Sequence, residues 1–112
     1  MADLPIGNEG NLTGATAVTV VAAPASGKQR ILPANGLSFY NADSVVHDFI
    51  VQKNKNSTIT IVWKQAAVAA AAVVLVAKKV TLDATDESLE AKIEGAHTTT
   101  APTFDVSAGE TD

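Results

Sequence analysis

The stretch Asn41–Lys64 constrains the fold more than any other part of the chain. It predicts two strands folded back on one another through a polar turn at Lys53–Asn56. In the second run, Ile59, Ile61 and Trp63 are predicted to share one face. Thr58, Thr60 and Lys64 share the other face, which Val62 interrupts. Alternation with a period of two, in β-branched and aromatic residues, is typical of a half-buried antiparallel strand.

Other segments show the same apolar or β-branched character between turn-forming residues. These strand candidates are Thr16–Ala23, Gln29–Leu32, Leu37–Asn41, Val80–Leu82, Ser88–Glu94 and Thr103–Ser107. The tetrapeptide PANG at Pro33–Gly36 predicts a turn or a bulge. Seven or eight short strands with turns between them predict an all-β fold, a single compact antiparallel β-sandwich or jelly roll.

The segment Gln65–Ala77 gives conflicting signals. Its alanines favour a helix, and Lys78 and Lys79 suit a helix C-terminus. The stiff β-branched valines at its end favour a strand, and a helix shorter than about twelve residues is marginal without packing. We expect a loop or a single helical turn at Gln65–Ala72, followed by a strand at Val73–Ala77.

The two ends of the chain are predicted to lie outside the sandwich. Residues 1–15 show neither a helical nor a strand period, residues 16–107 form the predicted sandwich, and residues 108–112 form a C-terminal tail. Residues 1–15 are either a loose tail or an extended arm. In the second case Leu4, Ile6 and Leu12 would contact a neighbouring subunit.

Composition argues against several classes of partner. The chain has 112 residues, a net charge of −4 and no cysteine, so it has no disulfide, thiolate nucleophile or cysteine metal site. Eight of its twelve acidic residues follow Leu82, and no basic stripe with aromatic residues occurs, so we expect no nucleic-acid partner. The apolar run Ala66–Ala77 would span only about 18 Å as a helix, so we expect no membrane span.

Catalytic and metal-binding signals are weak. His47 and Asp48 are neighbours on a predicted strand and point to opposite faces, so they are not expected to act together. A histidine in such a place is usually a surface or partly satisfied residue, and His97 lies in a threonine-rich loop. The acidic run Asp83–Glu90 lacks the spacing of an EF-hand loop. We therefore expect no enzyme, no cofactor and no metal site.

Four segments together resemble a known family. These are the early strand Thr16–Ala23, LSFYNADSVVHDFIV at Leu37–Val51, its partner STITIVWK at Ser57–Lys64, and VTLDATDESLEAKI at Val80–Ile93. Their order and pattern resemble small tailed-bacteriophage virion proteins of the head decoration, or cement, type. The alanine-rich run departs from that pattern.

The resemblance implies a mechanical role. Proteins of this type bind the outer surface of an icosahedral head, bridge subunits of the major capsid protein and stabilise the shell without bond chemistry. It further implies a homo-oligomer, such as a trimer, located at the capsid surface of the virion and made in the host cytoplasm. The arm with Leu4, Ile6 and Leu12 would be the strap that holds it there.

Two other functions fit the same residues. A structural β-sandwich of a phage neck, tail or fibre base would have a much lower copy number than the shell protein. A carbohydrate-binding adhesion module would need an exposed aromatic patch, whereas Trp63 and most other aromatic residues are predicted on apolar faces. The sequence leaves the oligomer order open.

Overall fold

The computed structural model describes residues 4–111, in which strands are the only regular elements. No helix in this part of the chain is long and apolar enough to cross a membrane. The strands are β1 (Leu4–Asn11), β2 (Val18–Val21), β3 (Gln29–Leu32), β4 (Leu37–Tyr40), β5 (His47–Lys55), β6 (Thr58–Val68), β7 (Val73–Leu75), β8 (Val80–Leu82), β9 (Glu87–Ile93) and β10 (Thr103–Thr111).

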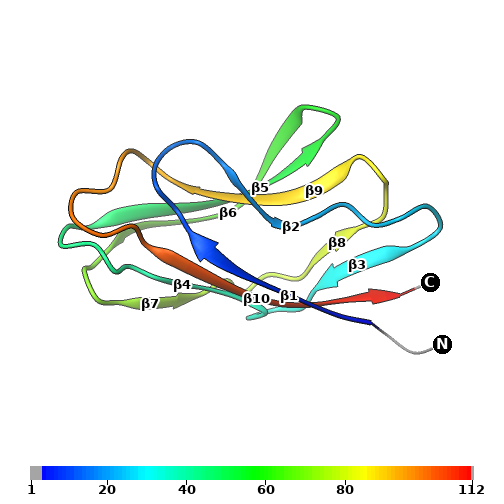
Figure 1. The fold of residues 1–112 in the computed structure, drawn as a ribbon, viewed down its shortest axis with the longest axis horizontal. Coiled ribbons are helices and arrows are strands. Elements are labelled where there is room, and N and C mark those ends of the chain that lie inside the picture. The colour runs from blue at the N-terminus through cyan, green and yellow to red at the C-terminus, as the bar shows by residue number, and fades with distance from the viewer. Residues whose placement is uncertain (1–3, 112) are drawn as a thin grey trace.

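The strands form two antiparallel sheets that pack face to face (Figure 1). The first sheet has β10 at its centre, with β1 along one side and β3 and β4 along the other. Beyond them, β8 pairs with β3 and β7 pairs with β4. The second sheet has the order β2-β9-β5-β6. The predicted all-β sandwich is confirmed.

Ten strands reduce to eight when interrupted strands are joined. Because β3 and β4 follow one another along the same side of β10, they act as one broken strand, and β8 and β7 do the same one position further out. The first sheet then holds the first, third, sixth and eighth members of an eight-stranded arrangement, and the second sheet holds the second, fourth, fifth and seventh. This is the architecture of a jelly roll. The structure has ten strands where seven or eight were expected, and β1 was not among the expected strands.

The interruption between β3 and β4 is the predicted PANG turn. Asn35 adopts a left-handed φ of 65°, a conformation that asparagine tolerates. A Cβ atom on Gly36 would lie 2.7 Å from the carbonyl oxygen of Ser107 on β10. Only glycine fits this close approach, so the chain can turn while remaining against β10.

The core lies between the sheets and consists mainly of aliphatic side chains. Phe39 and Phe49 are its largest fully buried side chains, and their ring centroids lie 4.9 Å apart. The remaining buried apolar side chains are Leu12, Val20, Val21, Leu32, Leu37, Val51, Val68, Val76, Val80, Leu82, Leu89, Ala91, Ile93, Phe104 and Val106. The alternation predicted for Ser88–Glu94 is observed in β9, where Leu89, Ala91 and Ile93 face the core.

The segment Gln65–Ala77 agrees with the prediction only in part, because the strand expected from Val73 is present but residues 65–68 are also strand. Strand β6 continues to Val68, a turn with Ala71 at a φ of 63° follows, and β7 begins at Val73. Gln65 lies opposite Phe49 and Val68 opposite His47, so the ladder to β5 supplies backbone partners as far as Val68. This pairing outweighs the helical preference of the alanines, because local propensity is small beside tertiary context.

Both predicted tails are largely part of the sandwich. Residues 4–11 form β1, and every residue of β1 lies opposite a residue of β10. Residues 108–111 are the second half of β10 and lie between β1 and β3. Strand β10 runs across the predicted boundary after residue 107, whereas residues 12–17, around the predicted boundary after residue 15, form no strand. Residues 1–3 and 112 of the predicted tails lie outside the described residues.

Candidate functional site

The three residues predicted to contact a partner have different surroundings. Leu4 is 57% exposed, Ile6 is half-buried, and Leu12 is fully buried in the core of its own chain. The backbone N–H of Leu12 donates to the carbonyl oxygen of Pro102 at 2.7 Å, which fixes the chain where β1 ends. Leu12 is thus a core residue and not a contact residue, while the role of Leu4 and Ile6 stays a prediction.

Strand β1 is held to the body mainly by backbone pairing. Its side chains are mostly exposed, and only β10 pairs with it among the described strands. Asn8 connects it to the other sheet, because its Nδ2 atom donates to the carbonyl oxygen of Val20 at 3.2 Å. A Cβ atom on Gly10 would lie 3.0 Å from the ring of Phe104, so the absence of a side chain there allows close packing. The other edge of β1 is open.

The edge of the second sheet is formed by β6, and a bulge decides which of its side chains are exposed. Trp63 lies opposite Val51, but Ile61 lies opposite Gln52, so Val62 is an extra residue in β6. Trp63 therefore packs against the core and stacks on Phe39 at 5.9 Å.

The same bulge turns two isoleucines to solvent. Ile59 and Ile61 are 46% and 53% exposed, on the outer face of the second sheet. The prediction that Ile59, Ile61 and Trp63 share one face is wrong, because a single extra residue reverses the alternation. No sequence signal marked Val62 as a bulge, although it interrupted the polar face.

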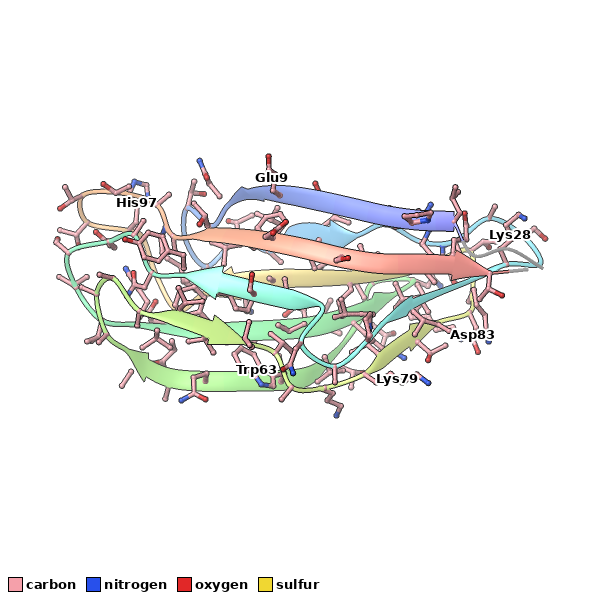
Figure 2. The ribbon with its side chains drawn as sticks, turned by 90° about the horizontal axis from the view of Figure 1, so that it is seen from below. Glu9, Lys28, Trp63, Lys79, Asp83 and His97 are labelled. Atoms are coloured by element: carbon pink, nitrogen blue, oxygen red, sulfur yellow. The ribbon has the colours of Figure 1, made fainter. Side chains whose placement is uncertain are left out.

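The outer face of the first sheet carries a shallow hollow of about 610 Å³. Tyr40, 42% exposed, lies opposite Thr103 and Val73 in neighbouring strands. Glu9 lies opposite Asp105, which places two carboxylates side by side across β1 and β10. The hollow thus combines one exposed aromatic ring with acidic and hydroxyl groups (Glu9 is labelled in Figure 2).

A buried polar cluster joins two loops at one end of the sandwich. His47 is 4% exposed, and its Nε2 atom lies 2.6 Å from Oδ2 of Asp43. Its Nδ1 atom lies 2.9 Å from Oε2 of Glu94, at the end of β9. Asp43 also accepts hydrogen bonds from the backbone N–H groups of Thr98 and Thr99, at 2.7 and 2.8 Å. The loop before β5 is thereby tied to the loop before β10.

The two ionisable groups of this contact stabilise each other's charge. Burial alone would raise the pKa of Asp43, but hydrogen bonds from His47 and from the backbone of Thr98, Thr99 and Ser44 hold that pKa far below its usual range. Burial alone would lower the pKa of His47, but the carboxylates of Asp43 and Glu94 raise it above 6.5. The structure therefore favours a charged imidazolium between carboxylates.

This cluster is suited to holding loops rather than to acid–base chemistry. Both ring nitrogens of His47 already contact carboxylates, and the ring is almost fully covered. A general base must be within reach of the proton that it takes from a substrate. The prediction that His47 is a surface or partly satisfied residue is wrong; the missed signal was Asp43, four residues earlier across a turn. Asp48 has a separate partner, the backbone N–H of Ala67 at 2.9 Å.

The remaining candidate ligands have partners within the protein. His97 is half-buried, and its Nδ1 atom lies 3.0 Å from the carbonyl oxygen of Thr13. Glu87 accepts a hydrogen bond from the backbone N–H of Asp83 at 3.0 Å and lies 3.5 Å from Nζ of Lys53. Glu90 accepts hydrogen bonds from Gln52 and Asn54. Within residues 4–111, His, Asp and Glu form no group of three that could hold a metal ion.

Comparison with known proteins supports the fold only. No protein-family model and no curated protein matches the sequence. The chain is similar to a structure described as "Bacillus endospore appendages form a novel family of disulfide-linked pili", with a TM-score of 0.55 and 11% identity over 97% of this chain and 85% of that one. At this identity the likeness establishes a common fold and nothing about partners.

Two viral structures show a weaker likeness. The cyanophage Pam1 capsid asymmetric unit gives a TM-score of 0.46 and 14% identity, covering 96% of this chain and 80% of that one. A virus-like particle of the extra small virus of the prawn Macrobrachium rosenbergii gives a TM-score of 0.41 and 12% identity, covering 98% of this chain and 79% of that one. At these TM-scores neither likeness carries an argument about function.

Proposed function

We propose that this chain is a structural virion protein that decorates the outer surface of an icosahedral phage head. The observation that carries the proposal is that the two longest terminal strands, β1 and β6, lie on opposite sides of the sandwich, each with an open edge (Figure 2). An open edge presents unpaired backbone N–H and C=O groups that can add a strand from another chain. A body with two such edges can connect two neighbours.

The β1 edge is the proposed contact with the major capsid protein. Leu4 is exposed beside this edge and Ile6 is half-buried, so both are available to a partner strand or pocket. Leu12 has no part in this contact because it belongs to the core. The sequence resemblance to decoration proteins supports the same role, which needs interface area and no bond chemistry.

The rigidity of the body supports a mechanical role. The cluster of Asp43, His47 and Glu94 joins two loops, and the side chains of Asp43 and His47 are almost completely covered. Hydrogen bonds that involve charged groups are stronger than neutral ones, and a fully satisfied network fixes one arrangement of the loops. A protein that transmits force between shell subunits benefits from such fixed ends.

Shell binding tests the proposal directly. Heads stripped of this chain are mixed with purified protein, and the bound fraction is measured by co-sedimentation. Leu4→Asp is expected to abolish binding while leaving the fold intact, because Leu4 is 57% exposed. Val46→Asp, at an equally exposed loop residue, is the matched control and is expected to bind normally. Normal binding by Leu4→Asp would contradict the role of β1, and failure of the unaltered protein to bind would contradict decoration.

A carbohydrate-binding role is favoured by one observation only. Tyr40 is exposed in the hollow of the first sheet, next to hydroxyl and carboxylate groups that could contact a sugar. The aromatic patch expected for that function is reduced to this single ring, because Phe39, Phe49 and Phe104 are buried and Trp63 packs on Phe39. Binding of Tyr40→Ala and unaltered protein to a glycan array distinguishes the two functions.

A further inference from the structure

We propose that the outer edge of β6 pairs with β6 of a second copy of this chain, so that two sandwiches share one continuous sheet. Strand β6 is the last strand of the second sheet, and β5 is its partner among the described strands. It is eleven residues long, which makes it the longest edge that the described chain presents. Long open edges are the places where chains add strands to one another.

The first half of this edge lacks the features that normally prevent such pairing. Natural edge strands are protected by lysines, prolines, bulges or a covering segment. From Asn56 to Trp63 there is no charged residue and no proline. The bulge at Val62 ends the regular part, so the segment available for pairing is Thr58–Val62.

The side chains of this segment gain from being covered. Ile59 and Ile61 are about half exposed on one face, and burial of their apolar surface is favourable. The end of the β5–β6 hairpin stands away from the first sheet (Figure 1), so a second strand can approach it. Exposure of β-branched apolar side chains on an open edge is a combination that soluble chains usually avoid.

A two-fold axis at Thr60 gives a register in which the segment is its own partner. In antiparallel pairing, Ile59 of one copy then lies opposite Ile61 of the other, and Thr60 lies opposite Thr60. Pairs of β-branched residues and of threonines stabilise a sheet, whereas like charges opposite one another destabilise it. The nearest charges cause no conflict, because Lys64 lies opposite Asn56 and Lys55 lies opposite Gln65.

Because this edge is complementary to itself, its proposed partner is a second copy of the chain. A two-fold interface uses the same surface on both subunits, so its sequence must fit itself when reversed. The segment Ile59–Ile61 does so, and in the same register Thr58 lies opposite the β-branched Val62. Such an interface closes at two copies, and it therefore predicts a dimer rather than the trimer that the family resemblance implies.

The pairing is tested by oxidation of single-cysteine variants. The chain has no cysteine, so one introduced thiol reports on one position. In Thr60→Cys the two thiols would lie directly opposite one another, within the roughly 4.4–6.8 Å between Cα atoms that a disulfide needs. In Thr58→Cys they would be offset by four residues, about 13 Å along the strands, beyond the reach of a disulfide. We expect a covalent dimer from Thr60→Cys and none from Thr58→Cys.

The second test is the mass of the unaltered protein in solution. Light scattering and sedimentation measure this mass over a wide range of concentrations. We expect a dimer whose dissociation constant increases at least about tenfold in Ile61→Lys, because the charge would be placed within the shared sheet. Val46→Lys, at a loop residue of similar exposure, is the matched control and should leave the constant unchanged. Circular dichroism confirms that both variants fold.

Three results would overturn the proposal: a monomer at every concentration, a trimer, or crosslinking through Thr58→Cys in preference to Thr60→Cys. The proposal is independent of the proposed decoration function, because every measurement uses the purified chain without capsid. A dimer that fails to bind heads would contradict decoration alone, and a monomer that binds heads would contradict the β6 pairing alone.

Discussion

Oδ2 of Asp43 lies 2.6 Å from Nε2 of His47, and the same carboxylate oxygen accepts a hydrogen bond from the backbone N–H of Thr98 at 2.7 Å. One side chain therefore joins the β4–β5 loop to the β9–β10 loop, and each of these loops connects the two sheets. Loops at the end of a sandwich are usually its most mobile parts. Here a buried ionic contact fixes them, and it makes the stability of the fold depend on pH.

The free energy of unfolding is expected to decrease as the pH rises above 6.5. Because the pKa of His47 is raised in the folded state, its stabilising effect is complete below the ordinary value of 6.5 and is lost as the pH rises through the folded value. Urea unfolding at a series of pH values from about 6 upward measures this decrease. His47→Gln should remove most of the slope; an equal slope in that variant would assign it to other groups.

Acid should act on the same cluster through Asp43. Its pKa is held below the ordinary value of 3.8, so its contribution is present above that pH and is lost as the pH falls through the lower folded value. Asp43→Asn is expected to lower the melting temperature at neutral pH more than Glu94→Gln, because the side chain of Glu94 is 42% exposed. Calorimetry of the two variants decides this, and a larger loss in Glu94→Gln would contradict it.

Leu12 and Leu4 are expected to respond differently to truncation. Leu12→Ala removes a fully buried side chain and should lower the free energy of unfolding by about 2–5 kcal/mol. Leu4→Ala, at an exposed residue, should change it by no more than about 0.5 kcal/mol. Denaturant unfolding of both variants measures the contrast. Equal effects would mean that Leu12 is not part of the core.

Trp63 should behave as a packing residue. Its ring stacks on Phe39 and it packs against the core, so its fluorescence is expected to be blue-shifted and unaffected by added glycans. Trp63→Ala should destabilise the fold by up to about 3–5 kcal/mol, the upper end applying to a fully buried ring. A red-shifted emission that moves on addition of a sugar would instead assign Trp63 to a binding site.

Periodicity and turn chemistry were sufficient to predict most of the strands. Gln29–Leu32 and Val80–Leu82 are strands with the predicted bounds, and the PANG turn lies where its residues indicate. These signals are local, because alternation and turn preferences depend on neighbours in sequence. The fold class followed from them.

Features that depend on distant partners were not predictable. The bulge at Val62 is seen only in its register with β5, and the strand character of residues 65–68 depends on the same ladder. Strand β1 has no period of its own and exists because β10 pairs with it. The contact of His47 with Glu94 joins residues far apart in sequence, so only its Asp43 half was within reach of sequence reasoning.

The copy number of this chain in purified virus particles tests the account most directly. Quantitative mass spectrometry compares it with the major capsid protein in the same particles. Decoration predicts a fixed ratio on the order of one copy per few shell subunits, because symmetric shells offer equivalent sites. A trace ratio would contradict decoration and assign the chain to the neck, tail or fibre base, and its absence from particles would contradict a virion role altogether.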